Sequence, residues 1–77
     1  MSARSARPVK HSLTLRGHRT SVSLEEAFWT EFRKLARSRG QSLNDLAAEI
    51  DADRGDVGLA SAIRLHVLRA ALAARSG

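Results

Sequence analysis

The chain has 77 residues, no cysteine and a formal net charge of +5. This length allows one domain of marginal stability as a monomer, and the lack of cysteine excludes disulfides and thiolate metal sites. The three histidines are scattered without ligand spacing, so the sequence predicts no metal and no cofactor. No apolar run approaches the roughly 20 residues needed to cross a bilayer, so no membrane partner is expected. Oligomerisation remains as a way to stabilise so small a domain.

All of the excess positive charge lies at the start of the chain. Residues 1–24 contain five basic side chains and no acidic one, whereas residues 25–77 contain eight of each. A positive segment on a neutral body is typical of a surface that binds phosphates. The plainer interpretation is a solvated basic tail that aids solubility.

Residues 1–11 are small, polar and without periodicity, which predicts a flexible basic arm before a domain over residues 12–77. The stretch is also rich in Arg and Ser, like a mitochondrial presequence, but it lacks an apolar face. A cytoplasmic, nucleoid-associated protein is the preferred interpretation. Residues 12–15 alternate and Gly17 follows, which indicates a short hairpin-like start.

Residues 19–24 form the stronger strand pattern. Thr20, Val22 and Leu24 alternate with Arg19, Ser21 and Ser23, so the two sets lie on opposite faces. Ser23 is also followed three residues later by Glu26, which is the spacing of a capping box at a helix start.

Three helices are expected after this strand. The first covers residues 24–38, with an apolar stripe that includes Phe28, Trp29 and Phe32, and Gly40 follows as its C′ residue. The second begins after Ser42, which caps it, and buries Leu46 and Ile50. The third covers residues 59–74. It is apolar on two sides, with Ile63 and Val67 on one, and Leu65, Leu68 and Leu72 on the other. A helix of this kind needs burial on both sides, and a second protomer is the natural source of the second surface.

The expected strand also needs a hydrogen-bonding partner for its backbone. The same strand from a second copy satisfies a two-fold axis and gives a two-stranded antiparallel ribbon between subunits. The predicted fold is therefore mainly α, with one short N-terminal strand, an intersubunit ribbon, and a third, C-terminal helix. The dimer core is expected to contain Thr20, Val22, Leu24, Phe28, Trp29, Phe32, Leu46, Ile50, Ile63 and Val67.

The residues of this region resemble the ribbon-helix-helix superfamily, which includes the Arc and MetJ repressors. The motif TSV-x-LE-x-x-FW begins at Thr20, G-x-SL begins at Gly40, and LASA-x-R begins at Leu59. Their order and spacing are similar to those of a small bacterial family of such domains, over about residues 12–72. The chain departs from the usual two-helix pattern because residues 51–58 separate a third helix.

This resemblance implies an intertwined homodimer that regulates transcription by inserting its ribbon into the major groove of double-stranded DNA. Alternate strand residues would read the bases, which carries over to Arg19, Ser21 and Ser23. Ser42 and the amide of Leu43, at the start of the second helix, would bind a phosphate. The basic segment adds Lys10, Arg16 and His18 as phosphate contacts.

An enzyme is not expected, because the sequence has no paired carboxylates, no Cys–His pair and no glycine-rich phosphate loop, and no small-molecule substrate is evident. The alternative function is a protein-interaction module, such as an antitoxin-like or adaptor dimer with only non-specific DNA affinity. The end of the sequence soon after the third helix argues against a long toxin-binding extension. Arg64 is expected either to pair with Asp51 or Asp53 across the dimer or to extend into solvent.

Overall fold

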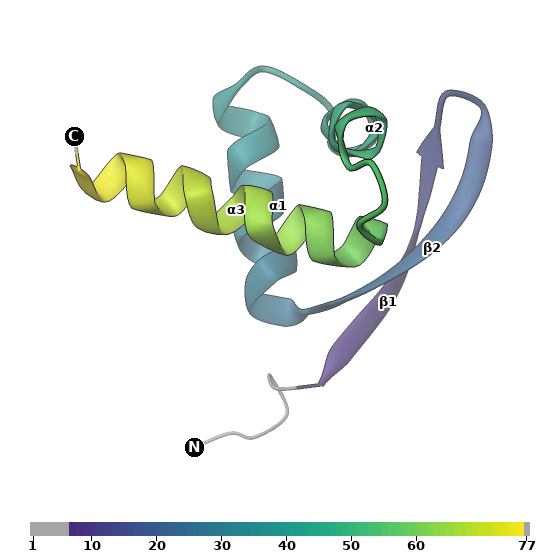
Figure 1. The fold of residues 1–77 in the computed structure, drawn as a ribbon, viewed down its shortest axis with the longest axis horizontal. Helices are drawn as coiled ribbons and strands as arrows, with labels where there is room; N and C mark the ends of the chain where they lie inside the picture. Colours follow the sequence, from purple (N-terminus) through teal and green to yellow (C-terminus); the bar gives the residue numbers. More distant parts are fainter. Residues whose placement is uncertain (1–6, 77) are drawn as a thin grey trace.

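A two-stranded antiparallel hairpin begins the fold (Figure 1). The structure is a computed structural model that describes residues 7–76. Strand β1 (Pro8–Leu15) pairs with strand β2 (His18–Glu25) along their whole length, from Pro8↔Glu25 to Leu15↔His18. Three helices follow: α1 (Glu26–Ser38), α2 (Leu43–Asp53) and α3 (Leu59–Ser76). The elements confirm a ribbon followed by helices.

Strand β2 has a partner within its own chain that the sequence analysis did not assign to it. It pairs along one edge with β1, and the pairing with a second copy stays a prediction. The pairing with β1 forms because Val9, Leu13 and Leu15 continue a period-two pattern back into the expected arm, and a two-residue turn brings this segment alongside β2. Residues 8–11 are therefore part of β1, and residues 1–6 of the expected arm lie outside the described residues.

The turn between the strands has the geometry that a tight hairpin requires. Arg16 and Gly17 both have positive φ, at 52° and 88°. Two consecutive positive φ values characterise a type I′ turn, whose twist matches that of the flanking strands. Gly17 adopts this conformation without strain, whereas Arg16 adopts one that residues with a Cβ rarely use.

Helix α1 begins two residues later than the sequence predicts. Its N-cap is Glu25, with no hydrogen bond from a side chain, so the expected capping box at Ser23 is wrong. The strand ladder explains this result, because Ser23 is still paired with Lys10 and the pairing continues to Glu25. At the other end, the amide of Gly40 donates to the carbonyl of Arg37, at 3.0 Å, and that of Gln41 donates to Ala36, at 2.9 Å. These two bonds form a Schellman motif, so the prediction that Gly40 is the C′ residue is confirmed.

The start of α2 agrees with the sequence. The Ser42 hydroxyl accepts a hydrogen bond from the amide of Asp45 at 3.0 Å, which confirms the predicted cap. Gly55 then turns the chain with φ 60° before α3 begins. Helix α3 extends away from the hairpin, so that the C-terminal end of the chain and the hairpin tip lie on opposite sides of the molecule (Figure 1).

One apolar core lies between the inner face of the hairpin and the three helices. The residues expected in a dimer core are placed here within one chain, although Thr20 and Phe28 are only half-buried. Trp29, Phe32, Leu24, Leu46 and Ile63 are its largest fully buried side chains. The remaining buried members are Leu13, Leu15, Val22, Ala36, Ala47, Ile50 and Val67. Because β1 supplies Leu13 and Leu15, the hairpin packs on the helices without help from a second copy.

Candidate nucleic-acid interface

The outer face of the hairpin is polar and open to solvent. Since side chains alternate along a strand, burial of Leu13 and Val22 on the helix side places their neighbours on the other side. Three cross-strand pairs occupy this outer face: Thr14 with Arg19, Ser12 with Ser21, and Lys10 with Ser23. Every one of these side chains is exposed except that of Ser23, which is half-buried. The six form a continuous surface of hydroxyl, ammonium and guanidinium groups, here called the outer ribbon face.

The sequence analysis predicted four of these six residues as site residues. The three predicted base readers, Arg19, Ser21 and Ser23, lie together on β2, and Lys10 joins them from β1. Ser12 and Thr14 were not predicted as site residues, because only a short alternating segment over residues 12–15 was expected there and not the whole of β1. The signal that identifies them is their alternation with Leu13 and Leu15. This alternation places Ser12 and Thr14 on the face of β1 opposite the leucines.

Positive charge is concentrated on the hairpin. Its exposed arginine and lysine side chains are Lys10, Arg16 and Arg19, and the exposed Arg7 directly precedes β1. The only carboxylate of this region is Glu25, at the end of β2, and it is engaged by Arg64 of α3. The hairpin therefore presents an excess of positive charge to solvent, with no free carboxylate to oppose an approaching polyanion.

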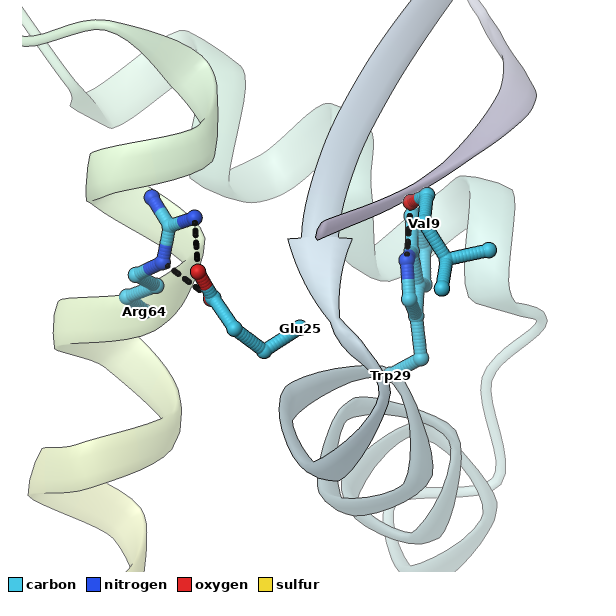
Figure 2. Close-up of polar contacts among 4 residues, drawn as sticks. All are labelled: Val9, Glu25, Trp29 and Arg64. Atoms are coloured by element: carbon cyan, nitrogen blue, oxygen red, sulfur yellow. Dashed lines mark hydrogen bonds and ion pairs between the residues drawn. The ribbon is translucent and has the colours of Figure 1, made fainter. Parts of the chain in front are cut away.

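The Glu25–Arg64 pair fixes the end of β2 to α3 (Figure 2). Arg64 Nε lies 2.8 Å from Glu25 Oε1 and Arg64 Nη2 lies 3.1 Å from Oε2, so the guanidinium binds the carboxylate through two hydrogen bonds. The hydrogen bond from Arg64 is the main reason that the pKa of Glu25 is lowered from 4.5. Arg64 was expected to pair with Asp51 or Asp53 or to extend into solvent; its partner is instead Glu25, 39 residues away in the same chain.

A second contact fixes the start of β1. Trp29 Nε1 donates a hydrogen bond to the carbonyl of Val9 at 2.8 Å (Figure 2). The ring of His11 meets the same indole edge-to-face, with 4.7 Å between the ring centroids. Trp29 is only 1% exposed, so α1 holds this end of the hairpin through a buried side chain. The pair Lys10↔Ser23 on the outer ribbon face is thereby positioned by a rigid element.

The predicted phosphate contacts are not all in one place. Arg16 lies at the exposed tip of the hairpin, and Lys10 lies on the outer ribbon face. The start of α2, with Ser42 and Leu43, reaches the free edge of β1, because the side-chain carbonyl of Asn44 accepts a hydrogen bond from the amide of Thr14 at 3.1 Å.

His18 is separated from these contacts. It lines a hollow on the helix side of the hairpin together with Asp51 and Arg54. The structure therefore brings four predicted phosphate contacts to the outer ribbon face, its tip and its edge, and places His18 elsewhere.

Two other features are absent from residues 7–76. None of the helices described there is long and apolar enough to cross a membrane. The same part of the chain contains no group of three or more histidine or carboxylate side chains that could hold a metal ion.

Comparison with protein families identifies the fold. The model of the ribbon-helix-helix domain matches residues 8–71, which include the hairpin, α1, α2 and most of α3. No curated protein and no solved structure gives a significant match. Members of this family are generally dimeric DNA-binding regulators without enzymatic activity. The match covers most of the chain, from the first strand into the last helix, and the chain therefore belongs to the ribbon-helix-helix domain family.

Proposed function

We propose that the protein is a sequence-specific, double-stranded DNA-binding regulator of transcription that acts as a homodimer and inserts its hairpin into the major groove. The observation that supports this most is the outer ribbon face, on which six polar or basic side chains project from a two-stranded ribbon. A two-stranded β-ribbon fits the width of the major groove of B-DNA. Association with the nucleoid follows from the same proposal.

Base recognition is assigned to the centre of the outer ribbon face. Arg19 offers two parallel donors, which match the two acceptors of guanine in the major groove. Ser21 and its cross-strand neighbour Ser12 offer hydroxyls that both donate and accept. Because β1 belongs to the same chain, Ser12 and Thr14 add to the set of readers that the sequence suggested.

Phosphate binding is assigned to the surroundings of that face. Lys10 and Arg16 supply positive charge, and the start of α2, with Ser42 and the amide of Leu43, offers the partial positive charge of a helix N-terminus. Arg16 also has a φ of 52° in the turn, where Asn or Gly is the usual residue. A strained residue in a turn suggests a function that compensates for the strain, and a phosphate contact is such a function.

The test is binding of genomic DNA fragments, followed by a salt series on the selected fragment. The double variant Arg19→Ala/Ser21→Ala should lose the preference for its site while keeping the far-UV CD spectrum of the parent. Loss of a bidentate guanine contact corresponds to about 1–3 kcal/mol of discrimination. The matched control is Arg37→Ala/Ser38→Ala, which removes the same two side-chain types from exposed positions at the end of α1.

Two further results separate base recognition from phosphate attraction. Lys10→Ala should weaken binding to all sequences equally and reduce the dependence of affinity on salt. If the folded Arg19→Ala/Ser21→Ala protein selects and binds its site as the parent does, the hairpin is not the reader. A parent protein that shows no preferred fragment would favour the alternative function, a protein-interaction module with only non-specific DNA affinity.

A further inference from the structure

Asn44 ties the start of α2 to the edge of β1. Its side-chain oxygen Oδ1 accepts a hydrogen bond from the amide of Thr14 at 3.1 Å, across 30 residues of sequence. Helix α2 lies beside the end of β1 that leads into the turn (Figure 1). A backbone amide only donates hydrogen bonds, so it must meet the oxygen of the Asn44 side chain and not the nitrogen. The bond therefore fixes the orientation of this side-chain amide as well as its position.

The helix end of this bond is firmly placed. Asn44 is the second residue of α2. The Ser42 hydroxyl caps this turn by accepting a hydrogen bond from the amide of Asp45 at 3.0 Å. Leu46 and Ala47, which follow in the same helix, are buried at 0% exposure. Because Asn has a short side chain with few rotamers, a fixed backbone at Asn44 leaves its oxygen little freedom.

The strand end of the bond lies directly opposite a proposed base reader. Thr14 pairs with Arg19, and both side chains are exposed on the outer ribbon face. Since the Thr14 amide donates to Asn44 and not across the ladder, Thr14 and Arg19 form a pair without ladder hydrogen bonds. Residues in such a pair have Cα atoms only about 4.5 Å apart. The position of Thr14 thus determines that of the backbone that carries Arg19.

Other described contacts hold this end of the hairpin less specifically. Leu13 and Leu15 are buried against the core, but apolar contacts have no preferred direction. The hydrogen bond from Trp29 reaches Val9, at the opposite end of β1. Among the described residues, the Asn44 bond is therefore the directional contact between α2 and the turn end of the hairpin.

We propose that Asn44 is a positioning residue for DNA recognition, because its bond to Thr14 holds the base readers of the hairpin at a fixed distance from the start of α2. This inference rests on the proposed function, in which the hairpin contacts bases and the start of α2 contacts a phosphate. Phosphate contacts set the register in which base edges are read, so the two contacts must fit one stretch of DNA together. Without the bond, phosphate contacts continue while discrimination between bases is lost.

The experiment compares the affinity for the selected DNA fragment with that for an unrelated fragment. Asn44→Ala removes the acceptor and should lower the ratio of the two affinities about tenfold, which is within the discrimination that one bidentate base contact provides. Its affinity for the unrelated fragment should equal that of the parent. Asn44→Leu, which keeps the bulk of the side chain, should behave in the same way. Both variants should keep the far-UV CD spectrum, since Asn44 is exposed and the cap at Ser42 remains.

Two further variants separate positioning from other roles. Asn44→Asp keeps an oxygen acceptor, so it should keep the affinity ratio of the parent although its added charge lowers the affinity for both fragments. Gln41→Ala removes another neutral side-chain amide beside the same helix start, together with its hydrogen bond to Glu49, and should also keep the ratio. If Asn44→Ala weakens binding to both fragments equally, Asn44 contacts a phosphate directly and the positioning role is wrong.

Amide hydrogen exchange of the free protein tests the bond itself. The Thr14 amide should exchange slowly in the parent and in Asn44→Asp, and faster in Asn44→Ala. A fast Thr14 amide in a parent that selects DNA would refute the positioning role and leave the proposed function standing. A slow Thr14 amide in a parent that selects no fragment would refute the proposed function, and this role of Asn44 with it.

Discussion

Trp29 is the side chain whose replacement tests the hairpin anchor most directly. The indole is 1% exposed, donates to the carbonyl of Val9 at 2.8 Å, and packs against Phe32 with 6.1 Å between ring centroids. It therefore belongs both to the core and to the contact that holds β1. Replacing it affects stability and the position of the outer ribbon face together.

The expected magnitudes follow from these contacts. Trp29→Ala should cost about 3–5 kcal/mol, a large part of the 5–15 kcal/mol typical of a folded domain. Trp29→Phe keeps one ring but removes the hydrogen-bond donor, which costs roughly 0.5–1.5 kcal/mol of folding stability. It also removes about two buried carbons, which cost ~0.8 kcal/mol each. The milder variant should therefore lose about 2–3 kcal/mol and remain folded.

Urea unfolding followed by far-UV CD measures this loss, since Trp29 is the only tryptophan and its fluorescence disappears with it. Amide hydrogen exchange should also show that Trp29→Phe exposes the first half of β1 more than α2. The control is Phe32→Leu, which reduces the core without removing the bond to Val9. If Trp29→Phe unfolds at the urea concentration of the parent, or if β1 exchanges no faster, the indole does not anchor the hairpin.

Three other substitutions have expected outcomes. Burial lowers the pKa of His66 from 6.5. The contribution of His66 to folding stability is therefore full above pH 6.5 and is lost as the pH falls through the pKa of the folded state. His66→Asn should flatten this pH dependence in urea unfolding titrations across that range. Arg64→Gln should raise the pKa of Glu25 toward 4.5, because the hydrogen bonds that lower it are removed, and carboxyl NMR titration measures this value. Arg16→Asn should stabilise the turn by on the order of 1 kcal/mol in thermal unfolding and weaken DNA binding at low salt; an unchanged affinity would exclude Arg16 as a phosphate contact.

The helices and the exposed side of β2 were predictable from local patterns. The hydroxyl of Ser42 and the freedom of Gly40 to adopt positive φ mark helix ends within a few residues of sequence, so they need no knowledge of the rest of the chain. The position of Arg19 and Ser21 on one face of the strand follows from strict alternation along it.

The features that the sequence did not reveal depend on distant contacts. The Ser23 motif fits a helix cap and a strand equally well, and only pairing with Lys10 of β1 decides between them. Arg64 has several acidic side chains within reach in principle, and its choice of Glu25 requires α3 to pack beside the end of β2. In the same way, the start of the chain was expected to be a flexible arm. The hydrogen bond that holds β1 comes from Trp29, which lies 20 residues from Val9 and is not visible in the local pattern.

The two-residue turn at Arg16 and Gly17 has a consequence for the proposed binding of DNA. A ribbon shared between two subunits disappears when the subunits separate at low concentration, whereas a hairpin within one chain survives dilution. Under the proposed function, each monomer then carries a complete reading element and holds half of a site by itself. Arrival of the second subunit adds avidity by raising the local concentration of the other hairpin. Occupancy of the site is thus expected to build in two steps as the protein accumulates in the cell.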